Sequence, residues 1–110
     1  MKLENIVDEL SLDVKTCMEG LGNEVTGVYV SDLLSDVMAN SKDGNIWITL
    51  QIHLNIVAVA GLKNLAGIII VGSRQLQEET LKKAEAEKVT IMTTPLQAFE
   101  AAGRLYQLFK

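Results

Sequence analysis

Three apolar, strand-like runs alternate with helix-like segments between Asn45 and Thr94. The runs are WITLQ, GIIIVGS and VTIMTT. Because parallel neighbouring strands need a long crossover connection, which is usually a helix, this alternation predicts a parallel sheet covered by helices. The middle run is continuously apolar, which is typical of a strand buried on both faces. We therefore expect GIIIVGS at the centre of an α/β sheet.

Elements before and after this region complete the predicted fold. Apolar residues three and four apart predict a helix over Lys2 to Leu10, and the segments LDVKTC and EVTGVYV predict two strands separated by the turn GLGN. Ser31 and the acidic residue after it are expected to open a helix that ends near Asn40. An amphipathic surface helix is predicted over Gln77 to Glu87. The capping-box sequence from Thr94 to Gln97 predicts the start of the last helix.

Length and composition limit the classes of protein to consider. With 110 residues, the chain is predicted to form a single domain over 1–110, and 48% hydrophobic with 22% charged residues exclude disorder. No apolar run approaches the ~18 residues of a membrane span. A formal net charge of -4 and scattered basic residues argue against nucleic acid as a partner. The amino terminus does not resemble a signal peptide, so we expect a cytoplasmic protein.

The segment from Asn55 to Leu65 predicts a helix with almost no polar face. Its apolar residues include Ile56, Val57 and Val59. A helix that is apolar all round must be covered on more than one side, and in a small domain this favours a subunit contact. The sequence therefore predicts a homodimer through this helix. A Val59→Glu variant is expected to give a folded monomer if the helix pairs subunits, and an unfolded chain if Val59 is in the core.

Polar residues follow the three predicted strands at their carboxyl ends, where open sheets of this type bind ligands. The loops are Gln51 to Asn55, Gly72 to Arg74, and Thr93 to Thr94. From them we select seven candidate ligand-binding residues: Gln51, His53, Asn55, Gly72, Ser73, Arg74 and Thr93. Gly72 permits backbone amides to converge on an anion, and Arg74 adds positive charge. The other interpretation of the second loop is a plain strand-to-helix turn, and it is the one that we favour.

Catalytic and metal-binding patterns are not visible in the sequence. His53 is the only histidine, and it fits either a structural role or an acid/base role. Cys17 is the only cysteine, so it is either a small buried hydrophobe or a reactive thiol. One histidine and one distant cysteine give no metal-ligand spacing. We therefore predict no catalytic residues, no metal and no cofactor.

Four segments together resemble the DRTGG domain family. They are YVSDLLSDVM, WITLQIHLNIVAVA, GIIIVGS and TTPLQAFEAAGRL, and the resemblance spans most of the chain. The family is similar in fold to the amino-terminal domain of the bacterial HPr kinase/phosphorylase. The resemblance thus implies a three-layer α/β/α sandwich with a mostly parallel sheet.

The signature loops of the family are altered in this chain. Where a Gly-Asp-Arg triplet belongs, the chain has Gln51, Ile52 and His53, and where a Thr-Gly-Gly triplet belongs it has 71–73, in which only Gly72 matches. No P-loop sequence is present, so the kinase activity of HPr kinase/phosphorylase is not carried over.

Members of the family occur alone or fused to regulatory and metabolic modules. The resemblance therefore implies a non-catalytic regulatory or protein-interaction module, with a protein partner or a second copy of the chain. The alternative is a domain or enzyme that binds a nucleotide or phosphometabolite at the strand-end loops.

Overall fold

The computed structural model describes all residues, 1–110, as one α/β unit. In chain order the elements are α1 (Leu3–Leu10), β1 (Asp13–Val14), the 3-10 helix η1 (Met18–Gly22), β2 (Gly27–Val30), α2 (Leu34–Asn40), β3 (Asn45–Thr49), α3 (Asn55–Lys63), β4 (Gly67–Ile70), α4 (Glu78–Glu87), β5 (Ile91–Thr93) and α5 (Ala98–Phe109). The five strands form one sheet in the order β1-β5-β4-β3-β2. Strands β2 to β5 are parallel, and β1 pairs antiparallel with β5. The predicted fold class is confirmed.

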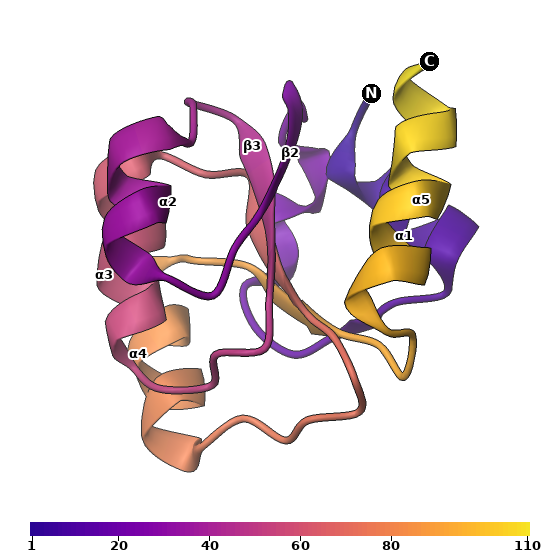
Figure 1. The fold of residues 1–110 in the computed structure, drawn as a ribbon. Helices are drawn as coiled ribbons and strands as arrows, with labels where there is room; N and C mark the ends of the chain where they lie inside the picture. The colour runs from indigo at the N-terminus through magenta and orange to yellow at the C-terminus, as the bar shows by residue number, and fades with distance from the viewer.

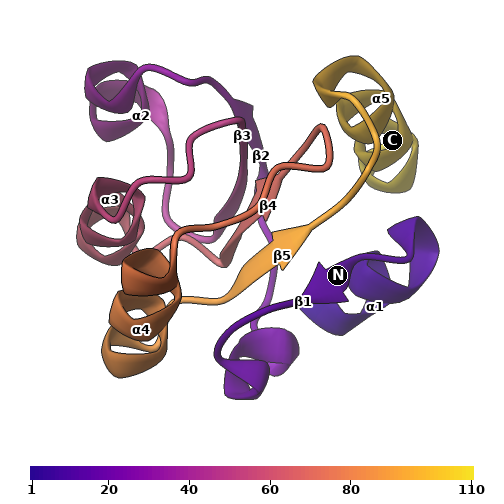
Figure 2. The same ribbon diagram turned by 90° about the horizontal axis from the view of Figure 1, so that it is seen from below.

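Helices cover both faces of this sheet. Strands β2 to β5 follow one another across the sheet in chain order. Because parallel crossovers are right-handed, three successive crossovers in one direction place their helices on the same face. Helices α2, α3 and α4 form that layer, and α1 and α5 lie on the opposite face (Figure 1, Figure 2). The chain is thus a three-layer α/β/α sandwich.

The two sheet faces bury two separate hydrophobic clusters. In β3, whose five residues are all buried, Ile46 and Ile48 join the cluster beneath α1 and α5, while Trp47 joins the cluster beneath α2, α3 and α4. The four residues of β4 are also all buried. The position of β4 as the third of five strands confirms the expected central placement of GIIIVGS.

The prediction that Ser31 and Asp32 open a helix is wrong by two residues. Helix α2 begins at Leu34. The Ser31 N–H donates to Ile48 O at 3.2 Å and so extends the pairing of β2 with β3. The Asp32 carboxylate accepts bonds from the end of β3. Tertiary hydrogen bonds therefore hold both residues outside the helix.

The predicted start of the last helix is also wrong. Helix α5 begins at Ala98, and Gln97 at its N-cap makes no side-chain capping bond. Thr94 Oγ1 instead accepts from the Leu96 N–H at 3.2 Å. The carbonyls of Thr94 and Leu96 accept from the loop after β4, which holds this segment outside the helix.

The apolar character of α3 is accounted for within one subunit. The helix lies on the sheet with α2 on one side and α4 on the other (Figure 2). Its buried residues are Ile56, Val57, Val59 and Ala60. Three covered sides explain why the helix has so few polar residues. Val59 is 8% exposed and therefore belongs to the core.

Candidate functional site

The carboxyl ends of β4 and β5 lie where the chain connections part. The connection after β4 leads to α4 on one face of the sheet, whereas the connection after β5 leads to α5 on the other face (Figure 2). Ligands of open α/β sheets bind in the crevice between two such strands. A hollow of about 470 Å³ opens at this point. We call it the strand-end hollow.

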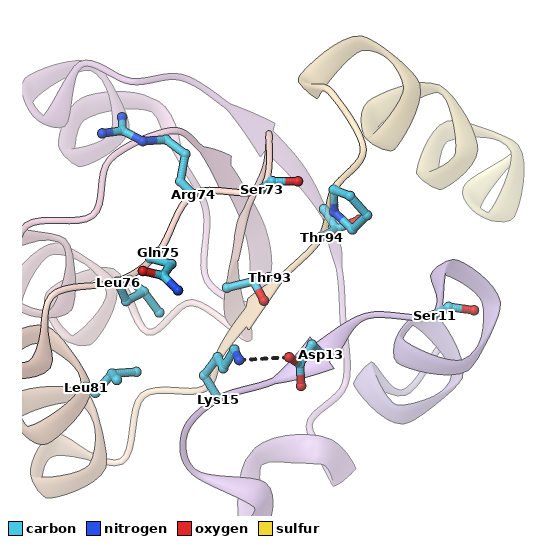
Figure 3. A pocket seen from close by; sticks show the side chains of 11 residues that line it. Ser11, Asp13, Lys15, Ser73, Arg74, Gln75, Leu76, Leu81, Thr93 and Thr94 are labelled. Atoms are coloured by element: carbon cyan, nitrogen blue, oxygen red, sulfur yellow. Dashed lines mark ion pairs between the residues drawn. The ribbon is translucent and has the colours of Figure 1, made fainter.

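Three chain segments supply the polar lining of the strand-end hollow (Figure 3). The segment around β1 supplies Ser11, Asp13 and Lys15, the loop after β4 supplies Ser73, Arg74 and Gln75, and the end of β5 supplies Thr93 and Thr94. The apolar part of the lining is formed by Leu76, Leu81 and Pro95. The lining thus offers hydroxyl groups, two cations and one carboxylate.

An ion pair enters the strand-end hollow from β1. Because β1 runs antiparallel to β5, its first residue, Asp13, lies opposite Thr93 at the last position of β5. Lys15 Nζ lies 2.8 Å from Asp13 Oδ2, and both side chains are largely exposed (Figure 3). Such an exposed pair contributes little to stability, so Lys15 can exchange its carboxylate partner for a ligand at low cost.

Backbone amides of the loop after β4 are already bonded within the protein. Gly72 (φ 75°) and Ser73 (φ 59°) both have left-handed backbone conformations. The Gly72 N–H donates to Leu96 O at 2.8 Å, and the Ser73 N–H donates to Thr94 O at 3.1 Å. These bonds support the strand-to-helix turn interpretation. A ligand would therefore meet the Ser73 hydroxyl, not these two amides.

Arg74 connects the loop after β4 with the loop after β3. Its Nη1 donates to Leu50 O at 2.9 Å. The Leu50 N–H donates to Asp32 Oδ1 at 2.7 Å, and Thr49 Oγ1 donates to the same oxygen at 2.8 Å. Since a guanidinium has five N–H groups, Arg74 retains donors for a ligand at the rim of the hollow. The ends of β2, β3 and β4 are thereby tied together.

The structure brings Ser73, Arg74 and Thr93 together among the predicted site residues. Gln51 and His53, in the loop before α3, and Asn55, the first residue of α3, lie outside the hollow. Gln51 Nε2 donates to Asp32 O at 3.0 Å, and the His53 ring contacts the Asn55 side-chain oxygen. These bonds give Gln51 and His53 local structural partners. A ligand role for them stays a prediction.

Local sequence patterns did not predict that Ser11, Asp13 and Lys15 line the strand-end hollow. A signal was present, because Asp13 and Lys15 are two apart in a predicted strand and so share a face. What was missing was the pairing partner of that strand, which lies about 80 residues further along the chain.

The side chains of the strand-end hollow are suited to binding. Its residues donate hydrogen bonds and supply positive charge, and no histidine or cysteine is among them. Nowhere in the structure do three His, Cys, Asp or Glu side chains gather as metal ligands. No helix has both the length and the hydrophobicity needed to cross a membrane.

Two residues with shifted pKa values lie away from the hollow, between β2 and α2. Tyr29 Oη donates to Asp36 Oδ1 at 2.7 Å, and Asn40 Nδ2 donates to the same oxygen at 2.8 Å. The bond from Tyr29, followed by that from Asn40, lowers the pKa of Asp36 below its ordinary value. The same bond to Asp36 raises the pKa of Tyr29.

A Tyr29→Phe variant is expected to lose stability in a pH-dependent way. Because the folded-state pKa of Asp36 is lowered, its contribution is present above the unfolded pKa and disappears as the pH falls through the folded pKa. The stability difference from wild type should therefore be larger at about pH 6 than at about pH 3, measured by urea denaturation. Tyr106→Phe, at an exposed tyrosine, is the control. An equal difference at both pH values would contradict the role of this bond.

Comparison with known proteins supports the fold. No protein-family model matches the chain, and no curated protein matches it. A similar solved structure is the CBS and DRTGG domain regulatory region of Clostridium perfringens pyrophosphatase, complexed with its activator, diadenosine tetraphosphate. The TM-score is 0.74 at 23% sequence identity, over 96% of this chain and 46% of that one, so this chain spans less than half of the regulatory region. The chain therefore has the α/β fold of a DRTGG-like domain.

Proposed function

We propose that this chain is a non-catalytic regulatory module that senses a phosphorylated small molecule in the strand-end hollow. The observation that carries this proposal is the position of the hollow at the crevice between β4 and β5, with Lys15, Arg74 and several hydroxyl groups around it. Cations and hydroxyls bind phosphate oxygens through charge-assisted hydrogen bonds. The solved structure of similar fold is a regulatory region bound to a nucleotide activator, which favours a nucleotide-type ligand.

The lining of the hollow also fits the base and the sugar of a nucleotide-type ligand. Leu76, Leu81 and Pro95 give the hollow an apolar portion, against which a flat base or sugar ring can pack. Asp13 is the one carboxylate of the lining, and it is paired with Lys15. A phosphate that takes over Lys15 would leave the Asp13 carboxylate to accept from ribose or base N–H and O–H groups.

Thermal shift with a panel of nucleotides, dinucleoside polyphosphates and phosphorylated metabolites tests this proposal. A ligand at about 100 times its dissociation constant adds about 2.7 kcal/mol to the free energy of unfolding. Arg74→Gln is expected to weaken that ligand at least about tenfold, since a hydrogen bond to a charged group contributes about 1.5–3 kcal/mol. Lys82→Gln, at an exposed lysine of α4 outside the hollow, is the matched control and should bind normally.

Two results would contradict the ligand-sensing proposal. One is the absence of any thermal shift across the panel. The other is a ligand whose affinity is the same for wild type and Arg74→Gln, because that ligand would be bound elsewhere on the protein.

The regulatory proposal includes a homodimer, but α3 offers little surface for it. The exposed residues of this helix are Ala58, Gly61, Leu62 and Asn55, and only Leu62 is a large hydrophobic side chain. Its remaining apolar residues are covered by the sheet and the neighbouring helices. The subunit contact is better sought on a larger exposed apolar surface.

A further inference from the structure

Strand β2 forms one edge of the sheet, opposite to the edge beside the strand-end hollow. It pairs with β3 on one side, and no strand lies on its other side. The Ser31 N–H donates to Ile48 O in β3. Because successive residues of a strand direct their backbone groups to opposite sides, the N–H and C=O groups of Val28 and Val30 face the open edge. These groups are available to a further strand.

This edge lacks the usual protection against pairing. Natural edge strands are blocked by lysine, proline, a bulge or a covering segment. The β2 sequence is GVYV, with neither lysine nor proline, and its pairing with β3 is regular over all four residues. Val30 is 49% exposed. The edge is therefore open and apolar.

An apolar surface continues from this edge onto α5. A groove of about 430 Å³ lies between β2 and α5. Its lining consists of Gly27, Val28 and Val30 of β2, Thr26 just before that strand, and Ala102, Tyr106 and Phe109 of α5. We call this surface the β2–α5 strip. Tyr106 is 67% exposed and Phe109 37% exposed. These exposed apolar side chains adjoin the open strand edge, so that the two together form a candidate interaction surface.

We propose that a second copy of this chain covers the β2–α5 strip, with its own β2 paired antiparallel to the first. The edge groups are arranged for this, because Val28 and Val30 are symmetric about Tyr29. In a two-fold arrangement, Val28 exchanges both backbone bonds with the partner's Val30, and Val30 does so with the partner's Val28. The two sheets then form one continuous sheet across the dimer.

The helices fit the same arrangement. Helix α5 packs over β2 and β3. Since paired strands lie about 4.8 Å apart, a two-fold axis beside β2 brings the two α5 helices to about 10 Å from each other. That separation is within the range of directly packed helices, about 8–10 Å. The exposed rings of Tyr106 and Phe109 lie where the two helices meet.

Charge favours a second copy as the occupant. The groove beneath the β2–α5 strip has no charged lining residue, so two chains of net charge -4 can meet there without burying like charges. An antiparallel pair of α5 helices places the first turn of one beside the last turn of the other. Glu100 lies on the other side of α5, where it pairs with Arg104, and so stays outside this contact.

Sedimentation equilibrium of wild type and three variants tests this interface. Wild type is expected to be a dimer, and Val30→Lys should weaken dimerisation at least about tenfold, because the charge enters an uncharged contact. Tyr106→Lys, on the helix side of the strip, provides a second disruption if the first variant unfolds. Leu62→Lys, on the exposed side of α3, is the matched control and should remain dimeric. Circular dichroism confirms that each variant is folded.

Three results would overturn the interface. They are a monomeric wild type at all concentrations, dimers that persist in folded Val30→Lys and Tyr106→Lys, and a Leu62→Lys chain that becomes monomeric. A wild-type chain that is monomeric but binds an extended peptide along β2 would also overturn it, in favour of a different protein partner. The strand-end hollow lies at the opposite edge of the sheet. Ligand binding by monomeric Val30→Lys therefore tests the sensing proposal separately.

Discussion

Replacing Trp47 with alanine is expected to lower the free energy of unfolding by about 3–5 kcal/mol. Trp47 is fully buried in β3, and its side chain belongs to the cluster beneath α2, α3 and α4. Its removal leaves a cavity against the central strands. Since domains of this size are stabilised by only about 5–15 kcal/mol, the variant should be close to unfolding. Equilibrium urea denaturation followed by far-UV circular dichroism measures the change, because Trp47 is the only tryptophan and its fluorescence is lost.

Trp47→Phe separates packing from hydrogen bonding at the same position. Trp47 Nε1 donates to Ser31 O at 2.7 Å, and this bond holds the end of β2 against β3. Phenylalanine fills most of the space but leaves that carbonyl without its donor, at a cost of about 1–3 kcal/mol. The expected order of stability is therefore wild type, Trp47→Phe, Trp47→Ala. An alanine variant as stable as wild type would contradict the placement of this side chain in the core.

Val59→Glu is expected to destabilise the protein by about 4 kcal/mol or more and to leave it largely unfolded. Val59 is only 8% exposed, and it belongs to a cluster of buried hydrophobic residues. A carboxylate there must be desolvated without a partner or be protonated, and both are costly. Thermal denaturation followed by circular dichroism, with size-exclusion chromatography, gives the measurement.

Leu62→Glu is the control for Val59→Glu, since it introduces the same side chain into the same helix. Leu62 is 75% exposed, so the substitution should change stability by no more than about 0.5 kcal/mol. A folded, monomeric Val59→Glu chain would show instead that this face of α3 is a subunit contact, as the sequence alone predicted.

Helices α2 and α5 begin at residues other than those that the sequence predicts. Ser31 with Asp32, and Thr94 with Pro95, both have the residue types of a helix start, yet α2 begins two residues later and α5 three residues later. At each place, backbone bonds to a neighbouring strand or loop hold the segment outside the helix. Local capping preferences, of about 0.5–2 kcal/mol, are too small to override such bonds.

Some residues of the candidate site could be predicted from local sequence patterns, and others are placed only by tertiary pairing. Ser73, Arg74 and Thr93 were predictable, because each follows a strand whose apolar pattern is clear and parallel strands end at the same edge of a sheet. Asp13 and Lys15 were not, because β1 has only two residues and gains its position solely by pairing with β5. Pairings between residues so distant in sequence leave no local pattern.

By itself, the sequence determined the α/β class, the alternation of strands and helices and the central position of β4, because these follow from hydrophobic periodicity along short stretches of chain. Only the tertiary structure decided which helices share a face, how α3 is covered, and which loops surround the strand-end hollow. Those features depend on contacts between residues far apart in sequence, whose identities no local pattern encodes.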